Sequence, residues 1–458
     1  MSLRIATSIA TAALVLGGAS AAAFGHAPPR GTALWWIPAQ DGAPGGVAGE
    51  RLVIRTPRGF LFQAASANDL RLLCNDAIGV QDGEEASFAI ADGGALLITT
   101  FARGLLRGNT DACRWDQVGT IVTTPAFDVA TAVVPGGSGE APAQFVIGGS
   151  PNQGDHFWGG RADGTWSALA NTDMPYTRVR IAPSDPSRIY LTGMALDASG
   201  MAVHRLGISA DAGTTVVEQL IPLGPTDLQA RVLGVNSVRP DQLYLRVESN
   251  SFELSERLLV SEDKGRSFTA AATLHEIQGF AQSVDGRDVW VGGTEGIRRS
   301  TDGGRTFSGP INATLTKITC LAFHQNRLYA CGVLDNQLVV AVSDDAGDSF
   351  RKVFSFDQVT QPVDCPQLDP ATSPAAVCAG SLEHWRSEFG TLTPPPMAGT
   401  GGAGAVPSAP PPGGCSVGGS EQGPGDAASL SMFLLAFAVW RRKRSPSATA
   451  EHEIHEAL

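Results

Sequence analysis

Four aspartates recur in the same short sequence context, and carboxylates of this kind could bind a metal or transfer a proton. They are Asp211, Asp263, Asp302 and Asp345, in the segments SADAGTTV, SEDKGRSF, STDGGRTF and SDDAGDSF. A calcium site needs several oxygen ligands around one ion, whereas these aspartates belong to separate repeats. We therefore predict a structural role for them and no metal site, with a calcium site as the alternative.

The residues around each aspartate indicate what that structural role is. A carboxylate at this position can accept backbone N–H bonds across a tight turn. The glycine two positions later supplies a positive φ, and the final aromatic residue can bury about 2 kcal/mol of apolar surface between neighbouring sheets. The glycines and phenylalanines concerned are Gly213, Gly265, Gly304, Gly347, Phe268, Phe307 and Phe350.

The spacing of the repeats predicts the architecture. Their starts lie about 40 to 50 residues apart, which is the length of one four-stranded propeller blade. Degenerate copies occur at 109–115 and 161–166, and a strand with an aromatic residue precedes each full copy, at Tyr190, Tyr244, Trp290 and Tyr329. The 54 glycines and 29 prolines favour short strands and turns. We predict an all-β propeller of seven blades, with six or eight as alternatives, centred on 50–80, 84–122, 126–172, 176–222, 230–275, 276–312 and 317–356. Residues 363–389 would finish the last blade or close the ring.

The repeat resembles the Asp-box, or BNR, repeat of sialidase-like and sortilin-like propellers. A sialidase would imply three arginines on a substrate carboxylate, a tyrosine nucleophile paired with a glutamate, and an aspartate acid/base. The nearest arginine contexts here are VIRTPRG and TRVRIAP, with Arg55 and Arg180. Three of the four tyrosines occupy repeated strand positions, which leaves Tyr176, and no glutamate is recognisably paired with it. We therefore predict no catalytic residues.

Other chemistry finds little support. The sequence contains no G-x-S-x-G, H-E-x-x-H or P-loop motif, and we expect no cofactor. Asp155 and His156 stand in a glycine-rich segment that we interpret as a polar loop. The formal net charge of −12 argues against a nucleic-acid partner, which rewards clustered Lys and Arg.

Six of the seven cysteines are expected to form three disulfides, because spaced cysteines in an exported protein favour disulfides over metal ligands. The candidates are Cys74, Cys113, Cys320, Cys331, Cys365 and Cys378. Local pairing would join Cys320 to Cys331 and Cys365 to Cys378, leaving Cys74 for Cys113. Six cysteines permit fifteen connectivities, so local pairing is a preference only.

Both ends of the chain indicate export and anchoring. Residues 1–25 have the basic start and apolar core of a signal peptide, with cleavage between Ala21 and Ala27. A Pro/Gly-rich linker at 391–425 contains the lone Cys415, a short apolar segment with an arginine cluster follows at 427–444, and 445–458 form a tail. This order resembles the MYXO-CTERM sorting signal of myxobacterial surface proteins, which implies that Cys415 is the anchoring residue. The alternative is a permanent single-pass membrane anchor.

The sequence as a whole favours a propeller domain at 27–390 that is held at the cell surface or outer membrane through its C-terminus. We expect a non-catalytic binding or scaffold module whose partner is an extracellular protein or polysaccharide. The alternative is a divergent glycoside hydrolase or lyase of the sialidase-like superfamily.

Overall fold

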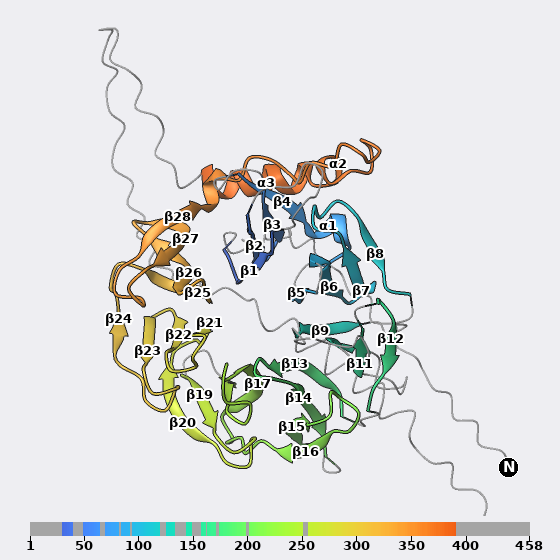
Figure 1. The fold of residues 1–458 in the computed structure, drawn as a ribbon. Coiled ribbons are helices and arrows are strands. Elements are labelled where there is room, and N and C mark those ends of the chain that lie inside the picture. The colour runs from blue at the N-terminus through green and yellow to red at the C-terminus, as the bar shows by residue number, and fades with distance from the viewer. Residues whose placement is uncertain are drawn as a thin grey trace, which may run out of the picture.

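Seven four-stranded antiparallel sheets are arranged as blades around a ring (Figure 1). The computed structural model describes residues 30–390, except for 40–48, 65–68, 82–83, 92–93, 120–124, 133–142, 149–156, 162, 171–173, 198–200 and 251–254. The prediction of an all-β propeller with seven blades is confirmed.

The strands of the first three blades are β1 (Ala33–Ile37), β2 (Arg51–Thr56), β3 (Gly59–Gln63) and β4 (Leu70–Cys74); β5 (Phe88–Ile90), β6 (Leu96–Thr100), β7 (Gly104–Gly108) and β8 (Trp115–Gln117); and β9 (Ala126–Thr131), β10 (Gln144–Gly148), β11 (Phe157–Gly160) and β12 (Trp166–Ala168). Those of blades 4 and 5 are β13 (Tyr176–Ala182), β14 (Asp185–Leu196), β15 (Ala202–Ser209) and β16 (Val217–Leu220); and β17 (Asp227–Val235), β18 (Leu243–Ser249), β19 (Glu256–Ser261) and β20 (Thr269–Leu274). Those of blades 6 and 7 are β21 (Gly279–Gln282), β22 (Val289–Gly293), β23 (Gly296–Ser300) and β24 (Pro310–Ile311); and β25 (Thr316–His324), β26 (Arg327–Leu334), β27 (Gln337–Ser343) and β28 (Arg351–Ser355). The helical elements are α1 (Asn75–Ile78), η2 (Phe356–Gln358), α2 (Pro374–Val377) and α3 (Ala379–Gly390).

Every blade is built from consecutive strands, and the first strand of each lies nearest the centre of the ring (Figure 1). The predicted blade ranges agree with the observed ones to within a few residues, except that blade 1 begins earlier, at β1. The reason is that residues 38–50 separate β1 from β2, whereas the other strands of this blade follow one another more closely.

The four repeats adopt one common turn between the third and fourth strands of blades 4 to 7. In the repeat of blade 7, Ser343 Oγ donates to Asp345 Oδ1 at 2.7 Å and accepts the Gly347 N–H at 2.7 Å. Asp345 Oδ1 also accepts the Ser349 N–H at 2.9 Å, and its Oδ2 accepts the Ser349 hydroxyl at 2.6 Å. The same contacts recur around Asp211, Asp263 and Asp302.

The turns of blades 6 and 7 also contact the preceding blade through a repeated aromatic residue. The Tyr244 hydroxyl of blade 5 donates to the Gly303 carbonyl in the turn of blade 6, at 3.0 Å. The Trp290 indole of blade 6 donates to the Ala346 carbonyl of blade 7, at 2.8 Å. Gly304 has a φ of +86°, and a Cβ there would lie 2.6 Å from the Tyr244 ring, so the turn requires glycine. Phe268, Phe307 and Phe350 are half-buried against apolar clusters that neighbouring blades share.

Residues 356–390 form a strap that closes the ring over blade 1 (Figure 1). Leu72 on β4, the edge strand of blade 1, exchanges backbone hydrogen bonds with Gln361 and Val363, at 3.0 and 2.9 Å. Trp385 of α3 is buried and donates its indole N–H to the Phe356 carbonyl at 2.9 Å. The sequence left open whether this region finishes the last blade or closes the ring; it closes the ring.

Two of the three disulfides fasten this strap. The expected three disulfides are present, and Cys320–Cys331 is local, as predicted. The other two predicted pairings, Cys365 with Cys378 and Cys74 with Cys113, were wrong. Instead, Cys74 is bonded to Cys378 and Cys113 to Cys365, across 304 and 252 residues of sequence. The physical reason is that the ring brings its two ends together, so cysteines remote in sequence become neighbours.

The predicted signal peptide and the segments from 391 to 458, with Cys415, lie outside the described residues. Within the part of the chain that the structure describes, no helix is both long and apolar enough to cross a membrane.

We predict that the strap disulfide stabilises the ring more than the local one does. Replacing Cys74 and Cys378 by Ser should lower the free energy of unfolding by about 3 to 5 kcal/mol, because the bond closes a long loop. The matched control, Cys320→Ser with Cys331→Ser, opens a short loop and should cost about 2 to 3 kcal/mol. Guanidinium denaturation measures both, and an equal or larger loss in the control would contradict the prediction.

The turns also predict how stability depends on pH. Hydrogen bonds from Ser349 and Ser343 lower the pKa of Asp345 from 3.8 to about 2. A carboxyl whose pKa is depressed in the folded state adds stability above its unfolded pKa, and this stability is lost as the pH falls through the folded value. The melting temperature should therefore fall between about pH 4 and pH 2, and less steeply in Asp345→Asn. Parallel slopes for the two proteins would refute this linkage.

Candidate functional site

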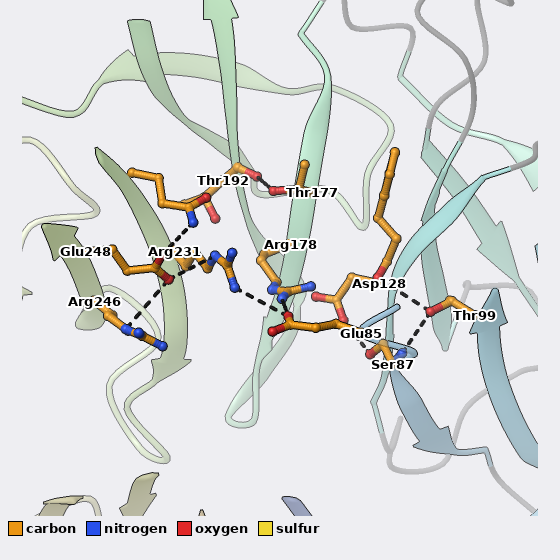
Figure 2. A network of polar contacts seen from close by, with 12 residues as sticks. Glu85, Ser87, Thr99, Asp128, Thr177, Arg178, Thr192, Arg231, Arg246 and Glu248 are labelled. Carbon is orange, nitrogen blue, oxygen red and sulfur yellow. Dashed lines mark hydrogen bonds and ion pairs between the residues drawn. The ribbon is translucent and has the colours of Figure 1, made fainter. Parts of the chain in front are cut away.

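Charged side chains gather on the inner strands of blades 3 to 5, on the next two strands of blade 5, and on the segment before β5 (Figure 2). We call this group the inner network, and it contains Glu85, Asp128, Arg178, Arg180, Arg231, Arg246, Glu248 and Glu256. These residues come from the segment before β5 and from β9, β13, β17, β18 and β19. The ring brings them together because the first strand of each blade lies nearest its centre.

Asp128 on β9 is the buried node of the network, with 2% of its side chain exposed. Its Oδ1 accepts the Ser87 hydroxyl of blade 2 at 2.5 Å. Its Oδ2 accepts the Val179 N–H at 2.9 Å and pairs with Arg180 Nη1 at 2.8 Å, both on blade 4. The Arg180 Nε in turn donates to the Leu233 carbonyl of blade 5 at 3.2 Å. The Asp128 carboxylate therefore links blades 2, 3 and 4. Arg180 adds blade 5 through its hydrogen bond to the Leu233 carbonyl.

Glu85 is a second carboxylate that links blades. It precedes β5 of blade 2 and contacts arginines of blades 4 and 5, with no contact to blade 3 among its ion pairs in the described residues. Its Oε2 accepts a hydrogen bond from Arg178 of β13 at 2.7 Å and lies 3.5 Å from Arg231 Nη1 of β17. About half of the Glu85 side chain, 52%, is exposed. Solvent therefore reaches this carboxylate although two guanidinium groups hold it.

The network continues outward through blade 5. Arg231 Nε lies 3.1 Å from Glu248 Oε1, which is 3.6 Å from Arg246 Nε. Arg246 makes a two-pronged ion pair with Glu256, at 2.7 and 2.8 Å. Glu256 Oε2 also accepts the Ile277 N–H at 2.6 Å, so the chain of charges ends on the segment leading to blade 6.

Electrostatics keep Glu85 ionised. Desolvation opposes its charge, but the positive charges of Arg178, Arg231 and Arg55 outweigh it, and the pKa of Glu85 lies well below its usual range. For Arg178 the balance is similar: desolvation is outweighed by Glu85 and Asp128, and its pKa is raised.

Arg55 on β2 of blade 1 is the third arginine that acts on Glu85. Among the residues that the structure describes, none forms a hydrogen bond or ion pair with its guanidinium. Desolvation lowers its pKa, while the charges of Glu85 and Asp128 raise it. Arg55 and Arg180 are the two arginines whose sequence contexts came nearest to those of a sialidase. Arg180 forms an ion pair with Asp128.

Tyr176 lies elsewhere, and one expectation about it was wrong. The sequence showed no glutamate paired with it, but its hydroxyl donates to Glu218 Oε1 of β16 at 3.1 Å. The pair had no sequence signal because 42 residues separate its members. The ring of Tyr176 is buried among side chains of blades 3 and 4, and desolvation, with the charge of Glu218, raises its pKa.

The structural-turn residues stand at the repeats and not in the inner network. Within the described ranges no group of His, Cys, Asp or Glu residues is arranged to hold a metal ion. Asp155 and His156 lie outside those ranges. A cavity of about 440 Å³ occurs at the outer part of blade 2, lined by Ala95, Arg107, Gly108, Asn109, Thr110, Arg114 and Asp116. It is separate from the inner network, and its Arg114 is already paired with Asp116.

A comparison with protein-family models finds no match, and neither does one with curated protein sequences. Among solved structures, the chain is similar to a GH74 enzyme of Niastella koreensis, with 14% identity, a TM-score of 0.33, and coverage of 69% of this chain and 56% of that one. It is also similar to the GH74 xyloglucanase of Xanthomonas campestris (12%, 0.40, 71% and 67%) and to a nidogen/laminin complex (15%, 0.36, 58% and 90%). The chain thus spans little more than half the length of the first of these proteins. The propeller assignment rests on the seven sheets themselves.

We predict that Asp128 is a strong determinant of stability. Asp128→Ala should cost about 3 kcal/mol of unfolding free energy, because Arg180 and the Val179 N–H lose their common acceptor. Asp116→Ala is the matched control: it breaks an exposed ion pair, with 68% of the Asp116 side chain exposed, and should cost less than about 1 kcal/mol. Chemical denaturation compares them, and similar losses would show that Asp128 is not a node.

Proposed function

We propose that this protein is an exported, surface-anchored propeller that acts as a non-catalytic binding or scaffold module for an extracellular protein or polysaccharide. The propeller domain, 27–390, would be presented on the linker 391–425. Anchoring would use Cys415 or the segment 427–444.

The main support for this proposal is that the carboxylates of the inner network are already engaged by hydrogen bonds and ion pairs. A general acid or nucleophile needs an oxygen that can reach a substrate. Asp128 and Glu256 have both oxygens engaged by arginines, a hydroxyl or backbone N–H groups. Glu85 is held ionised by arginines. Such acids support a binding surface better than they support bond cleavage.

Tyr176 supports the same conclusion. A tyrosine nucleophile needs a hydroxyl that can lose its proton and reach a substrate. Burial between two blades and the neighbouring charge of Glu218 both keep its proton in place. Its pairing with a glutamate is therefore better explained as the satisfaction of a buried hydroxyl.

Further features support the remaining parts of the proposal. The common turn of the four repeats is what an Asp-box identity would require, with the serine, aspartate and glycine each bonded in one way. Three disulfides fit an oxidising compartment outside the cytoplasm.

Glu256 favours the second candidate, a divergent glycoside hydrolase or lyase. Desolvation raises its pKa above the ordinary value, as a general acid would need. Its carboxylate nevertheless holds both Arg246 and the Ile277 N–H, so an acid role would require these contacts to break.

The test is incubation of the purified full-length protein with extracellular polysaccharide and with surface protein from its source cells. We expect cosedimentation with one of them and no increase in reducing ends or unsaturated products. Product release that Glu256→Gln abolishes would replace the binding proposal by the enzyme. Binding to neither material would reject both.

Anchoring is tested by mass spectrometry of the mature termini together with cell fractionation. We expect surface protein that begins between Ala21 and Ala27 and ends near Cys415. An intact Leu458 in surface protein would reject processing at Cys415 and favour the permanent anchor.

A further inference from the structure

The cavity at the outer part of blade 2 lies at a turn that the sequence shows as a degenerate repeat. Residues 109–115 align with the complete repeats, with Asn109 in the place of the serine, Asp111 in that of the aspartate and Cys113 in that of the glycine. Ala112 has a φ of +60°, and the residue at this position also has a positive φ in the complete repeats. Blade 2 therefore begins the same turn with different side chains.

These side chains change which polar groups the turn itself uses. In a complete repeat the serine hydroxyl donates to the aspartate and accepts the glycine N–H. In blade 2 the amide oxygen of Asn109 accepts the Arg114 N–H at 3.2 Å, and its NH2 group has no hydrogen-bond partner among the described residues. Cys113 is fixed by its disulfide to Cys365. The turn is thus held without the Asn109 NH2 group, which a ligand can use because Asn109 lines the cavity.

Two further side chains of the lining offer donors. Arg107 on β7 carries only N–H donors, and its guanidinium forms no ion pair or hydrogen bond within the described ranges. The Thr110 carbonyl accepts a hydrogen bond from Arg51, whereas its hydroxyl has no partner in that same part of the chain. A guanidinium, an amide NH2 group and a hydroxyl at one cavity complement an oxyanion.

The charges of the lining favour an anion as well. Arg107 and Asp116 are cross-strand partners, but the Asp116 carboxylate forms its ion pair with Arg114, at 3.2 Å. Two arginines and one aspartate line the cavity, so one positive charge is left over. The nearby charges of Asp111 and Arg51 act on each other. Because the whole protein carries a formal charge of −12, attraction of an anion must come from this local group and not from the overall field.

We propose that Arg107, Asn109 and Thr110 bind the phosphate or sulfate group of a saccharide at the outer part of blade 2. A phosphate or sulfate ester has more terminal oxygens than a carboxylate, so it uses more of the donors present. The proposal rests on the proposed binding function and names its ligand class. It places the ligand on the outside of the ring, away from the inner network.

The size and the remaining lining of the cavity indicate the saccharide. A volume of about 440 Å³ is in the range of small-molecule sites and exceeds what a single ion fills. Sugar hydroxyls both donate and accept, and the exposed pair of Arg114 and Asp116 offers a donor and an acceptor. Gly108 and Ala95 are small and leave room for a ring to approach.

The experiment is calorimetric titration of the full-length protein at neutral pH and constant ionic strength. The probes are inorganic phosphate, inorganic sulfate, glucose phosphate and glucose sulfate. We expect a glucose ester to bind more tightly than its inorganic ion, because the ring adds contacts. Arg107→Gln should weaken this binding at least about tenfold, since a charge-assisted contact is lost. Arg266→Gln is the matched control: it removes an exposed arginine from the complete repeat of blade 5 and should leave the affinity unchanged.

A second variant covers the case in which Arg107→Gln folds poorly. Asp116→Asn removes the one acid of the lining, so the esters should bind about threefold more tightly. A misfolded protein would not gain affinity in this way. The same change should have no effect on the binding of uncharged glucose.

An affinity that Arg107→Gln leaves unchanged, or that Arg266→Gln lowers equally, would overturn the site. Glucose esters that bind no more tightly than the inorganic ions would overturn the saccharide as its ligand. The tighter of the two esters identifies a phosphorylated or a sulfated saccharide. Cosedimentation with extracellular material that persists without any ester binding would support the proposed function through another surface, so the two proposals can fail separately.

Discussion

Two disulfides join the C-terminal strap to blades 1 and 2, and the relative position of the blades depends on this closure. Each sheet is built from consecutive strands, so no sheet contains both ends of the chain. Contacts between β1 and β25 and the covalent strap must therefore hold the first blade against the last. Arg55 belongs to blade 1, and closure brings its charge within reach of Glu85 and of Arg178 on blade 4.

Within the closed ring, each buried charged group is paired, either with partners from different blades or within one blade. Asp128 takes bonds from blades 2 and 4, and Arg246 binds Glu256 within blade 5. Removing one member of such a pair is costly because the other is left unpaired. Glu85 differs, since its carboxylate remains open to solvent. The same network thus combines the buried carboxylate of Asp128 with a carboxylate that solvent reaches.

The outer part of the ring follows a local rule that repeats from blade to blade. A serine, an aspartate and a glycine close the turn, and in blades 6 and 7 an aromatic side chain of the preceding blade also donates to its backbone. The contacts within the turn lie inside one blade, so they recur wherever the motif recurs. The aspartates of the repeats accept hydrogen bonds within their own turns, so they are not part of the inner network.

The sequence alone determined the fold class and most of the blade limits, and it favoured seven blades over six or eight, because strands, turns and the repeat are encoded within about 50 residues. It also indicated the local disulfide Cys320–Cys331. Only the tertiary structure decided that Cys74 bonds to Cys378, that Tyr176 meets Glu218, and that Glu85 meets Arg178. These contacts carry no periodic signal, since each arises where the ring brings remote segments together. The candidate site therefore depends on the tertiary structure, because its residues come from segments that only the closed ring brings together.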